Sequence, residues 1–187
     1  MIWESGPWKD DLYYYIEQIE NFNSAQYFDD DNAYTIVEKA IFYSAFIIRK
    51  LSDCKGKLSD EAEKYSLKIY SVKPLKQVDF WHRWISDDSH DWENEKKITV
   101  AGRNICNWLI HSYIFSVVYN EDNVIDNFFV CSDRYRNKNL YRIPMCEWVK
   151  YMKYIASDDI VRMSTHYDPQ ELDHIFDRKE RNKGEYI

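Results

Sequence analysis

Apolar residues recur at helical spacing near the start of the chain. Leu12, Tyr15, Ile16 and Ile19 fall on one face of a helix drawn over residues 8–22. Several of the intervening residues are acidic. The pattern predicts an amphipathic helix that buries one side against the protein core.

A second, more uniformly apolar segment follows. The motif DDDN at residues 29–32 is typical of a helix start, because carboxylates are stabilised at the positive end of the helix dipole. Residues 40–48 are apolar nearly all round, which predicts a central buried helix that ends near Arg49. Ser59 precedes acidic residues in the manner of an N-cap and predicts a third helix over residues 58–70.

The middle of the chain mixes tryptophan with charged residues. In the stretch VDFWHRWISDDSHDWENEKK we expect a short helix near residues 77–85 and then an exposed acidic loop, with the tryptophan rings anchoring the loop to the body. A fourth helix is predicted from about Lys97 to His111.

The hydrophobic pattern changes after His111. Three β-branched and aromatic runs within residues 112–143 are separated by the turn-forming motifs NEDN and RYRNKN. They predict a three-stranded antiparallel meander that Pro144 closes. A final helix over residues 145–159 should cover it, followed by a short helix or tail that begins at Asp168.

Together these elements predict a single α+β domain over residues 1–187. Residues 1–111 would form a mainly helical part, and residues 112–187 would hold the meander, the C-terminal helix and the tail. A chain of this length buries roughly 70% of the surface that its unfolded form exposes, which is enough for a substantial core.

Composition favours a folded protein outside the membrane. The chain has only 4 Gly and 4 Pro, and no apolar run approaches the roughly 18 residues of a membrane span. Its 4 cysteines form no CxxC pair, and the N-terminus lacks the pattern of a secretory signal. We therefore expect a soluble cytoplasmic protein with reduced thiols, no membrane partner, no metal and no cofactor.

The net charge of −7 argues against a surface that coats nucleic acid, but it leaves room for a local basic site. The stretch SDRYRNKNLYR offers one, with the cations Arg134, Arg136, Lys138 and Arg142. Basic side chains interleaved with aromatic rings grip the phosphates and bases of single-stranded nucleic acid. Alternatively, a charged hairpin tip protects the sheet from edge-to-edge pairing.

The stretch GRNICNWLIHSY carries the most organised polar pattern. At about 100° per residue, Arg103, Asn104, Asn107 and His111 share one stripe of the predicted helix, opposite an apolar face. Such a stripe would face a partner or a cleft, where His111 could transfer a proton near neutral pH and Arg103 could hold a phosphate. The alternative is structural: the stripe would satisfy buried backbone groups, and His111 would stabilise the helix end.

An arginine followed by asparagine, with a histidine further along the same helix, resembles the motif of the HEPN ribonucleases. The similarity covers residues 103–111. It implies a metal-independent ribonuclease in which Arg103 binds the scissile phosphate, Asn104 supports it and His111 transfers protons. It also implies a dimer that brings two such helices together.

Other polar groupings give less specific indications. Asp79 and His82 lie one helical turn apart, but a third metal ligand is not evident. Ser89, His90 and Asp91 are neighbours in sequence, whereas a catalytic triad is assembled through the fold.

The aromatic content suggests an interaction surface. With 7 Trp, 16 Tyr and 9 Phe, the chain carries more rings than one core of this size holds. Several are expected to form an exposed patch, among them Tyr13, Tyr14, Tyr27, Trp81, Trp84 and Tyr151. The preferred hypothesis is therefore an interaction protein without catalytic chemistry, which binds a protein partner or itself. The alternatives are a HEPN-like ribonuclease and a nucleic-acid-binding module that uses the hairpin at residues 134–142.

Overall fold

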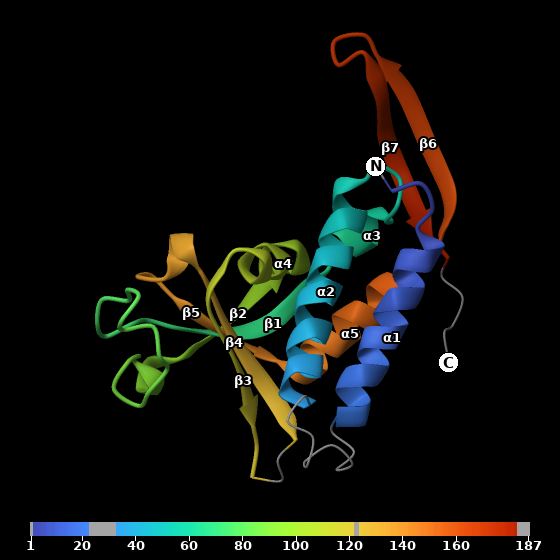
Figure 1. The fold of residues 1–187 in the computed structure, drawn as a ribbon. Coiled ribbons are helices and arrows are strands. Elements are labelled where there is room, and N and C mark those ends of the chain that lie inside the picture. The colour runs from blue at the N-terminus through green and yellow to red at the C-terminus, as the bar shows by residue number, and fades with distance from the viewer. Residues whose placement is uncertain (1, 23–32, 122–123, 183–187) are drawn as a thin grey trace.

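The computed structural model describes residues 2–22, 33–121 and 124–182 and confirms the α+β class. A five-stranded antiparallel sheet carries helices on one face and a long loop on the other, and a separate two-stranded hairpin projects from the helical end (Figure 1). The predicted helix start at residues 29–32 and the ring of Tyr27 lie outside the described residues.

The described helices are α1 (Gly6–Phe22), α2 (Ala33–Asp53), α3 (Asp60–Glu63), α4 (Gly102–Ile110) and α5 (Met145–Ala156). The strands are β1 (Ser66–Val72), β2 (Lys96–Ala101), β3 (Ser112–Tyr119), β4 (Ile125–Ser132), β5 (Leu140–Pro144), β6 (Ile160–Asp168) and β7 (Asp173–Arg181). Two short 3₁₀ turns, η1 (Trp92–Asn94) and η2 (Asp133–Tyr135), lie between them. The strand order in the large sheet is β2-β1-β5-β4-β3.

The first two helices follow the hydrophobic periodicity. Leu12, Ile16 and Ile19 of α1 are buried, as their spacing predicts. Helix α2 is less uniformly buried than expected, because Tyr43 and Phe46 are about half exposed. Both rings lie beside α1, where Tyr43 stacks on Tyr15 and Phe46 contacts Trp8.

The predicted third helix is wrong beyond its first turn. Ser59 does cap a helix, since its hydroxyl oxygen accepts the N–H of Ala62 at 3.1 Å. The helix ends at Glu63, and the following residues form strand β1, in which Leu67 and Ile69 point into the core. Alternating burial and pairing with distant strands override the helical propensity of this segment.

The predicted fourth helix is also too long. Residues 96–101 form the edge strand β2, which pairs with β1, and the helix begins only at Gly102. The β-branched residues Ile98, Thr99 and Val100 suit this strand. The short helix expected at residues 77–85 is wrong, because this segment is irregular.

The predicted meander is present as β3, β4 and β5, but it is only part of a larger sheet. Strand β4 pairs with both β3 and β5, each in antiparallel register. Strand β1 then pairs with the free edge of β5. Helix α5 covers the sheet directly after Pro144, as expected for a C-terminal helix.

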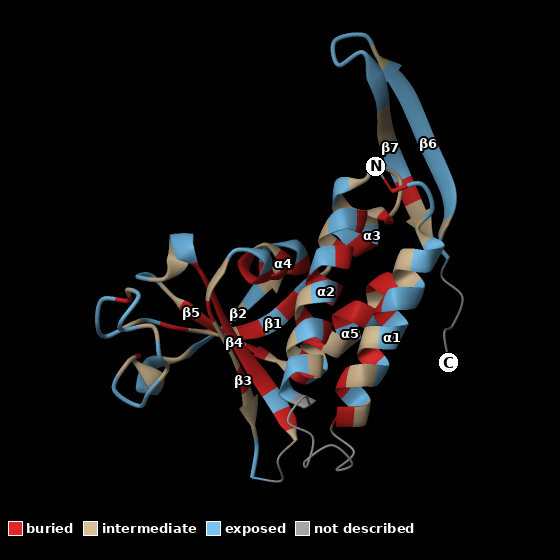
Figure 2. Cartoon of the chain, viewed as in Figure 1, coloured by how far each residue is buried: buried red, intermediate tan, exposed pale blue. Residues whose placement is uncertain are grey.

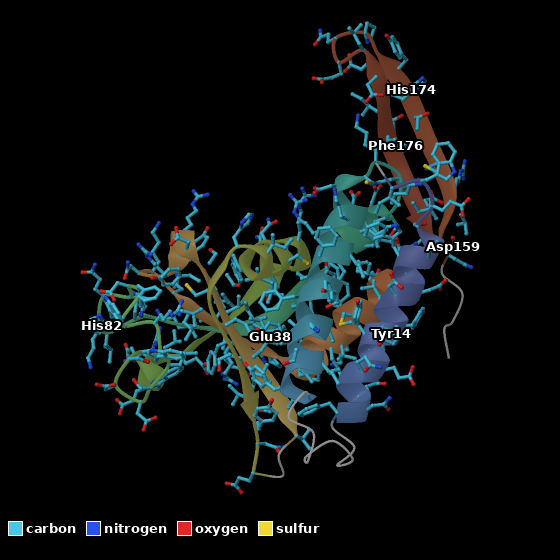
Figure 3. All side chains as sticks on the ribbon, in the orientation of Figure 1. Tyr14, Glu38, His82, Asp159, His174 and Phe176 are labelled. Atoms are coloured by element: carbon cyan, nitrogen blue, oxygen red, sulfur yellow. The ribbon has the colours of Figure 1, made fainter. Side chains whose placement is uncertain are left out.

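The last segment forms a hairpin instead of the predicted short helix or tail. The residue pair Asp168–Pro169 opens a turn, in which the carboxylate of Asp168 accepts the N–H of Gln170 at 2.7 Å. Strands β6 and β7 are mostly exposed and carry His174 well away from the sheet (Figures 2 and 3). The base of the hairpin is held by an ion pair between Lys179 and Glu63 of α3.

Most of the buried residues lie between the helices and the sheet (Figure 2). Many of them are aromatic. Phe128, Trp148 and Tyr151 are fully buried. The ring of Trp148 contacts the ring of Phe128 on one side and that of Tyr151 on the other. The Tyr151 ring also lies directly over Gly102, the first residue of α4. A Cβ atom at Gly102 would come within 2.2 Å of this ring.

We therefore expect Gly102→Ala to lower the free energy of unfolding by about 1–3 kcal/mol, because the added methyl group overpacks the core. Urea denaturation measures the change. Gly6→Ala is the matched control, since a Cβ atom there meets nothing within 4 Å. Equal stability of the two variants would contradict the close packing of Tyr151 on α4.

Candidate functional site

A cleft of about 630 Å³ opens beside α4, and it brings together residues from four parts of the chain. We call it the α4 cleft. It is lined by Arg49, Asn104, Asn107, Trp108, His111, Ser132, Asp133, Arg134 and Tyr135. The structure thus joins most of the polar stripe to one cation of the basic stretch, although these two sets are far apart in the sequence.

Arg49 enters the cleft from α2 and is held by two polar partners. Its Nε donates to the Oδ1 of Asn107 at 2.7 Å, and its Nη1 forms an ion pair with Asp53. Burial lowers the pKa of Arg49, and the nearby Arg103 adds to the effect. The amide of Asn107 therefore orients a charged guanidinium at the cleft wall. From the sequence, Arg49 is only a cation at a helix end, which gives no sign of this role.

Arg103 is separated from the rest of the stripe. Its Nη2 lies 2.7 Å from the Oδ1 of Asp53, and its Nη1 lies 3.4 Å from the carbonyl oxygen of Ser52. Asp53 thus forms ion pairs with both Arg49 and Arg103. Arg103 is not among the residues that line the α4 cleft.

His111 both ends α4 and lines the α4 cleft. Its backbone N–H donates to the carbonyl of Asn107 at 3.1 Å, and its carbonyl accepts the N–H of Asp133 at 3.3 Å. These bonds end α4 and tie it to the turn after β4. The imidazole is exposed and lines the α4 cleft, as the side chain of Arg134 does.

Aromatic rings form the floor of the α4 cleft. The rings of Trp108 and Tyr141 stack with centroids 3.7 Å apart and an interplanar angle of 4°. Tyr135 meets both rings edge-on, at 6.1 Å from Trp108 and 6.2 Å from Tyr141. Trp108 is only 8% exposed, so most of its ring is packed against these tyrosines, and Tyr135 is the other aromatic residue that lines the cleft.

The basic stretch is not the extended hairpin that the sequence suggests. Residues 133–135 form the turn η2, and Arg134 points its exposed side chain to the α4 cleft. Arg136 instead pairs with Asp133 at 3.0 Å and lies over the ring of Tyr113.

The remaining two cations also have aromatic neighbours. Lys138 lies 5.8 Å from the centre of the Tyr135 ring. Arg142, on β5, donates from Nε to Glu95 at 2.8 Å and lies 4.1 Å from the centre of the Tyr70 ring. The four predicted phosphate contacts therefore do not form one surface.

A second candidate site is the loop between β1 and η1, which covers the face of the sheet opposite the helices. We call residues 73–91 the aromatic loop. Its base is closed by a β-bridge between Pro74 and His90. Val78 and Ile85 pack on the sheet, and just beyond the loop Trp92 meets the ring of Phe129 at 5.5 Å.

The prediction that the tryptophan rings anchor this loop is wrong for two of them. Trp81 is 78% exposed and Trp84 is 75% exposed, with Phe80 close behind at 58%. The exposure expected for Trp81 and Trp84 is confirmed, and so is that of the half-exposed Tyr13 and Tyr14. Tyr13 and Tyr14 lie on α1, away from the loop, so the exposed rings do not form one patch (Figure 3). Tyr151 is buried, so its assignment to the patch is wrong.

Local bonds hold these exposed rings in place. The Oδ1 of Asp79 accepts the backbone N–H of Trp81 and of His82, and it lies 2.8 Å from the Nδ1 of His82. The hydrogen bond from His82 lowers the pKa of Asp79. The guanidinium of Arg83 lies over the rings of Phe80 and Trp84. The loop therefore exposes aromatic side chains from a backbone that local hydrogen bonds order.

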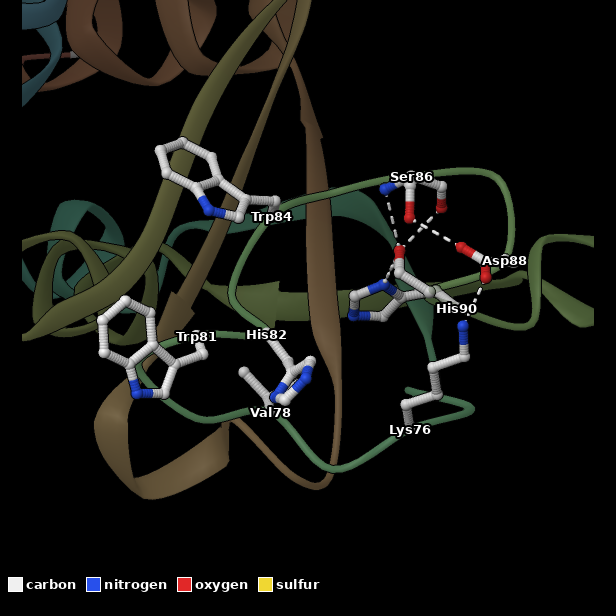
Figure 4. Close-up of a pocket in the computed structure, with 9 residues that line it drawn as sticks. Lys76, Val78, Trp81, His82, Trp84, Ser86, Asp88 and His90 are labelled. Atoms are coloured by element: carbon white, nitrogen blue, oxygen red, sulfur yellow. Dashed lines mark hydrogen bonds and ion pairs between the residues drawn. The ribbon is translucent and has the colours of Figure 1, made fainter.

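Behind the exposed rings lies a pocket of about 190 Å³ (Figure 4). It is lined by Lys76, Val78, Trp81, His82, Trp84, Ser86, Asp88, Ser89 and His90. His90 is only 2% exposed, and its Nδ1 lies 2.8 Å from the hydroxyl oxygen of Ser89. We call this space the His90 pocket. The sequence motif SHDWE points to His90 but not to a pocket.

Comparisons of the chain with protein-family models, with curated proteins and with solved structures gave no match. Within residues 2–22, 33–121 and 124–182, no three His, Cys, Asp or Glu side chains converge in a way that could hold a metal ion. None of the helices in those ranges is long and apolar enough to cross a bilayer.

Burial lowers the pKa of His90, so the folded protein binds a proton there less readily than the unfolded chain. As the pH falls below about 6.5, the unfolded chain binds a proton at this histidine and the folded protein does not, so the free energy of unfolding decreases. We expect wild-type stability to fall more steeply than that of His90→Gln between about pH 7.5 and 5.5. Urea denaturation across this range gives both slopes, and parallel slopes would contradict a buried neutral His90.

Proposed function

We propose that this protein binds another protein through its aromatic loop. The observation that carries the proposal is the exposure of Trp81 and Trp84 on one short, braced segment beside Phe80. Tryptophan is enriched among the residues that contribute most to protein interfaces. A surface that leaves several large rings in water is typical of an interaction site.

The polar surroundings of the rings also support an interface. Lys76 pairs with Asp88, and the carboxylate of Asp79 contacts the imidazole of His82, so the rim is polar. A hydrophobic centre with a polar rim is the usual composition of a protein-binding surface. Because local bonds already order the backbone at Trp81 and His82, less conformational entropy remains to be lost there on binding.

A photo-crosslinking amino acid placed at Trp84 tests the proposal in the cells that produce the protein. We expect it to capture a defined partner that the same probe at Trp3 does not capture. Trp3 is the matched control, because its side chain is 88% exposed but lies at the N-terminus, away from the loop.

The purified partner then gives the quantitative test. Trp81→Ala combined with Trp84→Ala should weaken binding about thirtyfold or more, since a hot-spot residue contributes about 2 kcal/mol or more. Trp3→Ala should bind like the wild type. Unchanged affinity of the double variant, or equal capture at Trp3, would refute the aromatic loop as the binding surface.

A second candidate function is binding of single-stranded nucleic acid in the α4 cleft. The observation that favours it is the meeting of Arg49, Arg134 and His111 in one cleft with the aromatic residues Trp108 and Tyr135. Cations that contact phosphates beside a ring that stacks on bases are the common elements of single-strand recognition. The overall charge of −7 disfavours nucleic-acid binding over the surface as a whole, so such binding needs a local basic site.

For this candidate, Arg134→Ala should weaken binding of a short oligouridylate and reduce the salt dependence. The slope of log K against log salt concentration should fall by about 0.7, the value for one lost phosphate contact on a single strand. Fluorescence anisotropy over a series of salt concentrations measures both quantities. Arg178→Ala removes an equal charge from the exposed hairpin and should change neither; equal effects of the two variants would contradict a specific cleft.

The ribonuclease alternative uses the same cleft and stays a prediction. His111 lies there beside Asn104, while Arg103 is engaged by Asp53. The arginine that lines the cleft from the helical side is Arg49. A HEPN-like reaction in this cleft would therefore take its phosphate contact from Arg49 of α2, in place of Arg103 of the motif.

A further inference from the structure

The His90 pocket contains a polar atom that the protein leaves unpaired. The hydroxyl of Ser89 donates to the carbonyl of Ser86 at 2.6 Å, so its only hydrogen is used. With the Ser89 hydroxyl donating to Ser86, we assign the hydrogen of the contact between Ser89 and the Nδ1 of His90 to the imidazole. In this tautomer the Nε2 of His90 is an acceptor.

This acceptor has no partner within the described chain, although it is buried. The ring of His90 turns its second nitrogen away from Ser89, toward the space bounded by Trp81, Trp84 and His82 (Figure 4). A buried acceptor without a donor costs free energy, because the hydrogen bonds that it made to water in the unfolded chain are not replaced. A ligand that brings an O–H or N–H group into this space would remove that cost.

The walls of the pocket select the kind of group that carries the donor. Trp81, Trp84 and Val78 present apolar surfaces, which favour a ring over a small polar side chain. A volume of about 190 Å³ suits a single six-membered ring, because a cavity of about 150 Å³ already holds benzene.

The charges at the rim select a neutral donor. Lys76 lines the pocket and offsets Asp88, and the guanidinium of Arg83 already lies over Trp84. An incoming lysine or arginine would lose its own hydration in a pocket where the carboxylate of Asp88 is already paired with Lys76. A phenol avoids this cost.

We infer that the His90 pocket receives a tyrosine side chain of the protein partner, whose phenolic O–H donates to the Nε2 of His90. This inference rests on the proposed function of the aromatic loop and deepens it. The ring stands between the indoles of Trp81 and Trp84, and the hydroxyl meets the acceptor at the floor of the pocket.

The test uses two probes that differ by one hydroxyl group, N-acetyl-L-tyrosinamide and N-acetyl-L-phenylalaninamide. NMR titration of the full chain follows the Nε2 resonance of His90 and the indole N–H signals of Trp81 and Trp84. The tyrosine probe should shift all three and bind about tenfold more tightly than the phenylalanine probe. Equal affinities, or no shift at His90, would overturn the inference.

Two variants assign the preference to one histidine. His90→Phe should bring the affinity ratio of the two probes to about one, whereas His82→Ala should keep it, because the Nδ1 of His82 is engaged by Asp79. Loss of the preference only in His82→Ala would also overturn the inference. The wild-type comparison of the two probes stands even if a variant fails to fold.

These titrations use the isolated protein, whereas crosslinking at Trp84 reports on the partner. If the probes show no hydroxyl preference while capture at Trp84 persists, the tyrosine inference fails and the proposed function stands. If capture fails as well, the proposed function fails on its own measurement.

Discussion

The contact between Gly102 and the ring of Tyr151 determines where α4 lies. Because Gly102 has no side chain, α5 approaches the first turn of α4 more closely than any other residue would allow. Tyr151 is itself held between Tyr65 and Trp148 in the core, and the N–H of Gly102 donates to the carbonyl of Tyr65 at 2.9 Å. With its start fixed from two sides, α4 turns its polar stripe toward α2 and the turn after β4. The α4 cleft is a consequence of this placement.

The two candidate surfaces are held in place by different forces. The α4 cleft is built on helices and strands whose positions the core sets, so its residues are preorganised. The aromatic loop has no regular structure over Trp81 and Trp84 and depends on local bonds to Asp79 and Ser89. Full burial of one indole is worth about 4–6 kcal/mol at the usual transfer coefficient. Two such rings left in water are a large unused source of binding free energy.

Sequence periodicity predicted the elements whose hydrophobic pattern is local, and it missed the strands that form by pairing with distant segments. Helices α1 and α2 and the strands of residues 112–143 show clear periods, and the structure has them. Ser59 does start a helix, but residues 66–72 form a strand because β2 and β5 supply partners that the local sequence does not reveal. The polar stripe was visible from helical spacing. Arg49 and Arg134 could not be added to it, since only the tertiary fold brings α2 and η2 to α4.

The two surfaces are connected, although they lie on different parts of the sheet. The side-chain oxygen of Asn137 accepts the N–H of Val78 at 2.7 Å, which ties the aromatic loop to the turn that carries Arg134. Tyr135 in the same turn packs against both the main core and the smaller cluster beneath the loop. A shift of the loop on binding a partner would therefore act on this turn directly. The position of Arg134 at the α4 cleft thus depends on the packing of the aromatic loop as well as on α4 itself.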